Sequence, residues 1–306
     1  MTDSNISAMI YGMIVGEFIG IINSNSNVCD EHVTRYKLIH PFQYHNLSLH
    51  IRLMFQLGIS VVQMKTYNQG HLLNAYFLSV GEDDRFKIKN TNMINIYNLY
   101  NQTKFSMNHK DVLTKLSVRG ELNQTNEALL RCIPLLLCGD DSVKEDCNVT
   151  NPYGDCIDCN IFFLRLLKRC LTNERVKLDE KMSVNLNIRK IIFLAKNKFP
   201  MDLKYNVSSW SNALYCALYA YSHIDSFEEG MRWVIKNSSK KDVTENAAMV
   251  GCVVGAKMGK KIEEESITRK NFYEVRQIMG QTGLKGDVDL YINTFYECFT
   301  DVANKK

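Results

Sequence analysis

Two stretches of small residues at opposite ends of the chain most constrain what it can fold into. Each carries a small residue at every fourth position: Ala8, Gly12, Gly16 and Gly20 in one, and Ala247, Gly251, Gly255 and Gly259 in the other. On a helix of 3.6 residues per turn, this spacing places the small residues along one narrow face. Each glycine inside a helix costs about 1 kcal/mol relative to alanine, so close backbone packing must compensate. The two helices are therefore predicted to pack against each other at their small faces.

In most of the other long segments, the apolar residues also recur with helical spacing. Only four prolines occur in 306 residues, which also favours an all-α fold. No linker rich in proline, glycine or serine divides the chain, so we expect a single compact domain over residues 1–306.

Composition narrows the classes of function. The formal net charge of +4 is mild and the basic residues are dispersed among acidic ones, so no basic patch indicates nucleic-acid binding. The apolar residues 6–22 imitate a signal peptide, but Asp3 precedes them and Glu17 interrupts them, so neither secretion nor a membrane role is expected. Ten cysteines in a chain of this size indicate reduced thiols in an intracellular, cytoplasmic protein.

The apolar spacing predicts a series of helices with recognisable starts and stops. They are expected at residues 46–62, 93–100, 111–118, 126–137, 155–171, 178–196, 208–221, 227–236, 271–280 and 288–302, with a possible short strand at 36–39. Asn46 or Ser48 is expected to cap the first of these, and Pro134 to kink or restart the helix at 126–137. Ser226 and Glu229 form a capping box.

Oxygen-bearing side chains gather where the small-residue helices would meet. Asp242, Thr244 and Glu245 precede or open the C-terminal helix, where unpaired N–H groups favour anions, so they are either a cap or a site. If the two small-residue faces pack against each other, Glu17 is expected to lie near Asp242. Carboxylates of this kind are ligands of Mg²⁺ and Ca²⁺. The alternative is that each helix packs on another neighbour and Glu17 faces solvent.

A pair of cysteines suggests a second, weaker site. Cys156 and Cys159 form a CxxC motif, but neither a second pair nor a nearby histidine completes a tetrahedral zinc set. Buried small side chains are therefore the favoured interpretation.

Several of these motifs, in this order, make the chain resemble the ADP-ribosylglycohydrolase family, which includes the dinitrogenase-reductase-activating glycohydrolase. The family's G-x-x-x-G-D-x-x-G helix matches residues 12–20, and its N-G-x-x-M-R-x-x-P segment matches residues 126–134. A T-H-P helix start matches residues 150–152. The family's alanine-rich helix matches residues 210–221, and its SFEEAL helix start matches residues 226–230. Its G-D-x-D-T turn, with the glycine-containing helix that follows, matches residues 242–259. The resemblance spans most of the chain and implies the family's compact all-α domain.

The resemblance also implies a metal site in which this chain departs from the family. Active members hold two Mg²⁺ ions between a first-helix acid, a T-D-D-T motif and the late aspartate turn. The family-equivalent metal positions are here Glu17, Asn46, Ser48, Asp242, Thr244 and Glu245, with Leu47 at one aspartate position. A cluster of two Mg²⁺ ions needs anionic oxygens, and too few remain, so weak or absent metal binding is expected.

In the loop that the family uses for its ligand, the resemblance assigns ADP-ribose binding to Asn126 and Arg131. The glycines that flank the asparagine in the family are Thr125 and Glu127 here. A glutamate at that position adds bulk and negative charge where the backbone would approach a diphosphate.

These departures predict an ADP-ribosylglycohydrolase-like pseudoenzyme, with Glu17 and Asp242 as vestigial catalytic residues. It would act by residual binding of ADP-ribose or an ADP-ribosylated protein, or through a structural role. One alternative is an active hydrolase that uses Glu17, Asp242 and Glu245, with Ser48 or Asn46, on a reduced metal site. Another is a structural or interaction protein without a ligand, for which the lens crystallins of the family are a precedent.

Overall fold

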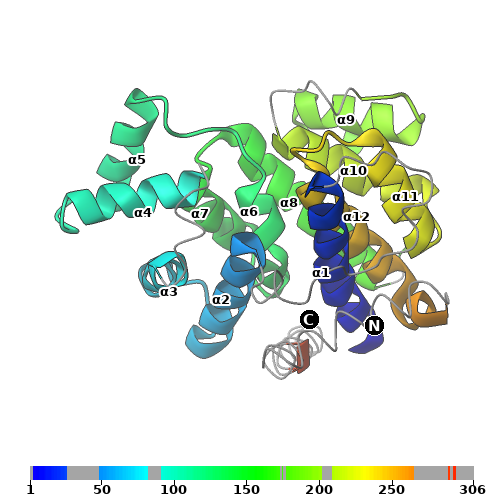
Figure 1. Cartoon of the computed structure of the whole chain (residues 1–306), viewed down its shortest axis with the longest axis horizontal. Coiled ribbons are helices and arrows are strands. Elements are labelled where there is room, and N and C mark those ends of the chain that lie inside the picture. Colours follow the sequence, from blue (N-terminus) through cyan, green and yellow to red (C-terminus); the bar gives the residue numbers. More distant parts are fainter. Residues whose placement is uncertain are drawn as a thin grey trace. The chain divides into compact units, whose positions relative to one another are not determined.

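The computed structural model describes residues 3–25, 48–81, 91–172, 174, 177–201, 209–264, 289 and 292–293. Within these ranges every regular element is a helix, so the predicted all-α fold is confirmed (Figure 1). The chain divides into two compact units, each of which packs mainly within itself. Unit 1 comprises Met1–Asn46 and Arg165–Asp301, and unit 2 comprises Leu47–Leu164 with Val302–Lys306. A single domain over the whole chain stays a prediction.

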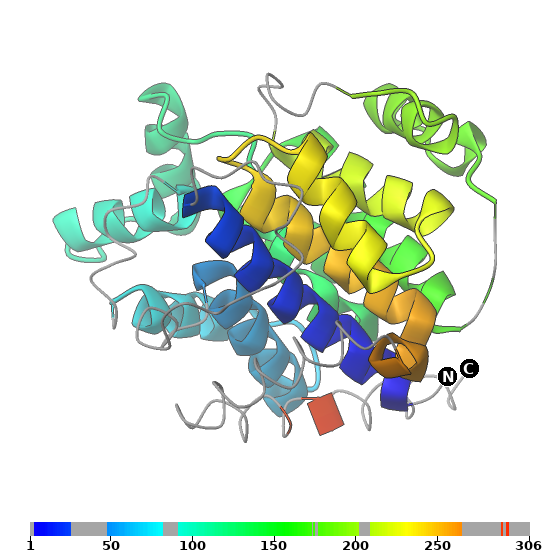
Figure 2. The ribbon, with the colours of Figure 1, turned by 45° about the vertical axis from the view of Figure 1, so that its right-hand side comes forward.

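Unit 1 is built on an antiparallel pair of helices, α1 (Asp3–Asn25) and α12 (Val243–Met258), which lie side by side (Figure 1, Figure 2). A Cβ atom added to Gly12 would lie 2.3 Å from the carbonyl oxygen of Gly251, and one added to Gly255 would lie 2.1 Å from that of Ala8. These distances leave no room for a side chain, so the small residues allow the two backbones to approach closely. The predicted pairing of the two stripes is confirmed.

Of the next described helices of unit 1, two cover α12 and the third packs on one of these two. They are α9 (Leu186–Lys196), α10 (Ser209–His223) and α11 (Phe227–Asn237), with 3-10 turns at Glu180–Met182 and Gly259–Glu264. Both α10 and α11 pack on α12, which explains why α12 is apolar on nearly every side. Ser226 caps α11, because its Oγ accepts the N–H of Glu229 at 3.1 Å.

Unit 2 consists of shorter helices. They are α2 (Leu49–Met64), α3 (Gln69–Gly81), α4 (Asn92–Gln102), α5 (His109–Val118), α6 (Glu127–Arg131), a 3-10 helix at Ile133–Leu137 and α7 (Asp140–Thr150). The boundary between the units falls within α8 (Gly154–Leu171). The six residues Ile96, Leu99, Tyr100, Val112, Leu116 and Leu122 form a buried apolar cluster between α4, α5 and the segment that follows.

Several predicted boundaries are correct. Ser48 caps α2, since its Oγ accepts the N–H of Ile51 at 3.3 Å. Gly120 ends α5 with a positive φ of 68°, a conformation that glycine adopts without strain. Pro134 stands in the first turn of the 3-10 helix that follows α6, so it marks a second helix start as expected.

Other predictions need correction. Helices α3 and α7 were not predicted, because glycines bound the first and the second is mostly polar. The predicted helix at 178–196 is too long, since only Leu186–Lys196 is α-helical and a 3-10 turn precedes it. The possible strand at 36–39 and the helix at 271–280 lie outside the described residues, as does nearly all of 288–302.

Candidate functional site

The start of α12 holds the best-preserved acidic residue of the predicted site. Asp242 precedes the helix, but its side chain makes no capping bond to it. Instead, Asp242 Oδ2 accepts a hydrogen bond from Ser239 Oγ at 3.0 Å and a long one from Asn212 Nδ2 at 3.5 Å. The carboxylate is therefore held from its own turn and from α10, and it does not serve as a helix cap.

The pairing of α1 and α12 brings the other unit 1 residues of the site to the same end of these helices. A Cβ atom on Gly20 would lie 2.4 Å from the Cα atom of Thr244, so this part of α1 lies against the first turn of α12. Glu17 belongs to the same part of α1 and is 3% exposed, which rules out the solvent-facing alternative. Glu245 follows on α12 and is partly buried.

A buried polar cluster lies around Asp242, and sequence reasoning missed its other members. Asn212 is fully buried on α10, and Asn246 Nδ2 donates to Ser238 Oγ at 3.0 Å. Each of the two asparagines keeps an Oδ1 without a hydrogen-bond partner among the described residues. The one signal in the sequence is Asn212 itself, a polar residue inside the apolar stripe of α10.

The other metal positions that the resemblance implies are Ser48 and Asn46. Ser48 lies in unit 2, where its hydroxyl caps α2, and Asn46 lies outside the described residues. Within the described ranges, no group of three or more His, Cys, Asp or Glu side chains is placed to hold a metal ion. Thr244 contributes no charge where a cluster of two Mg²⁺ ions needs anionic oxygens, so the described residues at the start of α12 do not fit such a cluster.

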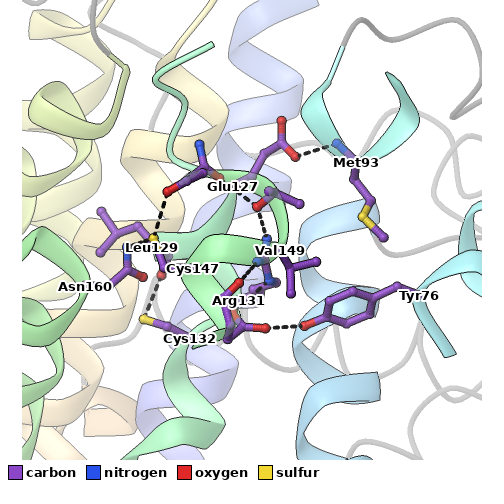
Figure 3. A network of polar contacts seen from close by, with 12 residues as sticks. Tyr76, Met93, Glu127, Leu129, Arg131, Cys132, Cys147, Val149 and Asn160 are labelled. Atoms are coloured by element: carbon purple, nitrogen blue, oxygen red, sulfur yellow. Dashed lines mark hydrogen bonds and ion pairs between the residues drawn. The ribbon is translucent and has the colours of Figure 1, made fainter. Parts of the chain in front are cut away.

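The predicted ligand loop lies in unit 2, and its arginine belongs to a buried network (Figure 3). Arg131 is 0% exposed, and its Nε donates to Asp146 Oδ2 at 3.0 Å, while Nη1 donates to Thr150 Oγ1 at 2.8 Å. Tyr76 donates to the other oxygen of Asp146 at 3.1 Å. Burial alone would lower the pKa of Arg131, but the charge of Asp146 outweighs it and raises that pKa. Arg131 therefore stays charged and ties α6 to α7.

Glu127, which the resemblance aligns with a glycine of the family, points toward Met93 of its own unit (Figure 3). Its carboxylate accepts the N–H of Asn92 at 2.7 Å and that of Met93 at 3.1 Å, at the start of α4. Burial raises the pKa of Glu127, and these two amides oppose that shift. The side chain caps a helix of its own unit. Asn126 is also buried, and its carbonyl accepts the N–H of Leu130 at 3.0 Å.

The cysteines of unit 2 are consistent with a packing role. Cys156 and Cys159 are buried thiols that form no disulfide, as are Cys132 and Cys147. Burial raises the pKa of Cys156 to about 12, whereas a reactive or metal-binding cysteine needs an accessible thiolate.

The protein belongs to the class of all-α proteins, with a closely packed pair of small-residue helices and an acidic turn at the start of α12. Comparison of the chain with known protein families identifies the family. The chain belongs to the ADP-ribosylglycohydrolase family, whose model matches residues 5–281. A solved structure titled "ADP-ribosylglycohydrolase-related protein complex" is similar over 97% of this chain and 98% of that chain, with a TM-score of 0.69 and 13% identity. At that identity the likeness shows a shared fold. No curated protein matches. None of the described helices is long and apolar enough to cross a membrane.

Proposed function

We propose that this chain is a catalytically impaired member of the ADP-ribosylglycohydrolase family, which acts by binding ADP-ribose or an ADP-ribosylated protein, or through a structural role. The observation that carries the proposal is the loss of negative charge at the family positions around Asp242. The neighbouring family aspartate is Thr244, and Leu47 stands at an aspartate position of the T-D-D-T motif. A site with this composition lacks the anionic oxygens that would hold two Mg²⁺ ions.

Metal dependence is typical of the family, and Mg²⁺ is the ion that the resemblance implies. When bound in active members, the metal orients the ADP-ribose hydroxyls and an attacking water. In this chain Glu17, Asp242 and Glu245 are the acidic residues left at family positions. We propose that they bind Mg²⁺ weakly or not at all.

An active hydrolase with a single metal ion is the second candidate, and one observation favours it. Asn212 Oδ1 is buried without a hydrogen-bond partner among the described residues, on the side chain that contacts Asp242. An amide oxygen is a neutral ligand that a hard cation accepts. A structural protein without a ligand is the third candidate.

The first experiment is a hydrolysis assay on peptides that carry ADP-ribose on arginine or on serine, with and without Mg²⁺. We expect no release of ADP-ribose above the background. Mg²⁺-dependent release that Asp242→Ala abolishes would overturn the proposal. Asp141→Ala, which removes an exposed carboxylate from α7, is the matched control and should leave any release unchanged.

Calorimetric titration with ADP-ribose then separates binding from a structural role. Saturable binding supports a protein that recognises ADP-ribose, and no heat of binding supports the structural role. Glu17→Gln and Asp242→Asn should weaken such binding if the start of α12 is the site.

We further propose an intracellular, cytoplasmic location and no nucleic-acid partner. Eight of the ten cysteines are described as free thiols, which supports a reducing compartment. Fractionation of the native host cell, followed by immunoblotting, would test the location.

A further inference from the structure

A cavity of about 540 Å³ lies in unit 1 where the C-terminal ends of several helices meet. Arg169 and Cys170 come from the last turn of α8, residues 221–223 from the end of α10, and Lys196 from the end of α9. The remaining lining residues are Glu174, Lys177, Leu178, Asp225 and Lys257. The volume falls within the roughly 300–1,000 Å³ of small-molecule sites.

Helix C-termini carry partial negative charge, and in this cavity Lys257 neutralises the nearest one. Its Nζ donates to the carbonyl oxygens of Ala220 at 3.2 Å, Tyr221 at 2.9 Å and Ile224 at 2.6 Å. The same ammonium lies 3.6 Å from Asp225, whose side chain is 98% exposed. Lys257 thus donates hydrogen bonds to the carbonyl oxygens at the end of α10. It also forms an ion pair with Asp225, one of the two acidic residues that line the cavity.

The other charged groups do not pair in the same way. Glu174 accepts a hydrogen bond from the hydroxyl of Thr172 at 3.1 Å, and Lys196 lies 3.6 Å from Glu180. Arg169 and Lys177 have no acidic partner within 4.0 Å among the described residues. The cavity therefore contains two cations without an ion-pair partner among the described residues.

We propose that this cavity binds a small molecule that carries a phosphate group on a planar or apolar body, such as a nucleoside monophosphate. The planar guanidinium of Arg169 matches two phosphate oxygens, and the ammonium of Lys177 adds a point charge. Leu178, Cys170 and the ring of Tyr221 provide the apolar wall for the body of the ligand.

This site is distinct from the one at the start of α12. Asp242 and Lys257 stand at opposite ends of that helix, about 22 Å apart at 1.5 Å per residue. The inference therefore goes beyond the proposed function, and either can fail without the other.

The experiment is calorimetric titration of the full chain with AMP, with inorganic pyrophosphate and adenosine as companion probes. We expect saturable binding of AMP, weaker binding of pyrophosphate and none of adenosine. In the double variant Arg169→Gln/Lys177→Gln, the affinity for AMP should fall at least tenfold. Lys190→Gln removes an exposed cation of α9 outside the cavity and should change the affinity less than twofold.

Each contrary result has a definite meaning. Absence of heat with AMP and pyrophosphate at millimolar concentrations overturns the inference. The inference also fails if the double variant binds AMP as tightly as the wild type does and has the same melting temperature. Equal binding of adenosine and AMP overturns phosphate recognition. AMP binding that Asp242→Ala abolishes but the double variant keeps would place the ligand at the start of α12 and also overturn the inference.

Discussion

Glu127 places a carboxylate that is only 2% exposed inside unit 2, and its hydrogen-bond donors make that burial tolerable. The amides of Asn92 and Met93 are among the first N–H groups of α4, which have no partner within their own helix. A charged acceptor at this end also complements the helix dipole. Glu127 thus has a structural role at the start of α4.

Glu127→Gln should lower the free energy of unfolding by about 1–3 kcal/mol, because the amide group can replace only one of the two acceptors and leaves a buried N–H unpaired. Urea denaturation followed by circular dichroism measures this change. Glu121→Gln, at an exposed position before α6, is the matched control and should change stability by about 0.5 kcal/mol or less. Equal effects of the two substitutions would contradict the capping role.

His109 gives unit 2 a predictable response to pH. Its Nε2 lies 3.2 Å from the carbonyl oxygen of Val149, which can only accept, so Nε2 carries the proton. Its Nδ1 lies 3.2 Å from the hydroxyl of Tyr100 and accepts from it in the neutral ring. Burial lowers the pKa of His109 below its ordinary value of 6.5. The neutral ring is therefore the form that the fold favours.

The pKa of His109 is lower in the folded chain than in the unfolded chain, so the unfolded chain binds more protons as the pH falls below 6.5. The stability that the neutral ring contributes is therefore lost on acidification. Denaturation at pH 7.5 and at lower pH values should show the decrease, and His109→Gln should make it smaller. A slope unaltered by His109→Gln would argue against this proton linkage.

At the scale of elements, the pair α1 and α12 depends on the absence of side chains at its crossing points. An added Cβ on Gly251 would lie 2.1 Å from the carbonyl oxygen of Gly12, and backbone atoms cannot rotate away as side chains do. The contact between the backbones compensates for glycines that would weaken an isolated helix.

Gly251→Ala should destabilise unit 1 by about 2–3 kcal/mol, because overpacking exceeds the roughly 1 kcal/mol that alanine gains in a helix. Thermal and urea denaturation measure the loss. Gly154→Ala is the control, since nothing lies within 4 Å of an added Cβ there. Stabilisation by Gly251→Ala would mean that the two helices separate easily.

Some contacts between elements are predictable from the sequence, and others are not. The spacing of the small residues predicts that α1 and α12 each pack closely against another helix, and the structure shows that each is the partner of the other. The contact between Asp242 and Asn212 is not predictable in this way, since Asn212 lies 30 positions earlier in the chain, on a different helix. The role of Glu127 also depends on a contact between residues 35 positions apart in the chain, and no local pattern specifies it.

At the scale of the whole molecule, two units with their own buried interiors should respond separately to destabilisation. Gly251→Ala should lower the hydrogen-exchange protection of amides in α1 and α12, and should leave α4 and α5 near their original protection. Glu127→Gln should instead lower the protection of amides in α4 and α5, and should leave α1 and α12 near their original protection. Exchange measured by mass spectrometry tests both variants, and equal loss in both units would show that the chain opens as one cooperative body.

The pairing of the first and last described long helices has a consequence for synthesis on the ribosome. Helix α1 is completed near residue 25, but the partner of its small-residue face ends at Met258. At a translation rate of roughly 5–20 residues per second, the intervening chain takes on the order of 10–50 s to appear. During that interval α1 is an apolar nascent segment without its partner, and we expect cotranslational chaperones to engage it first.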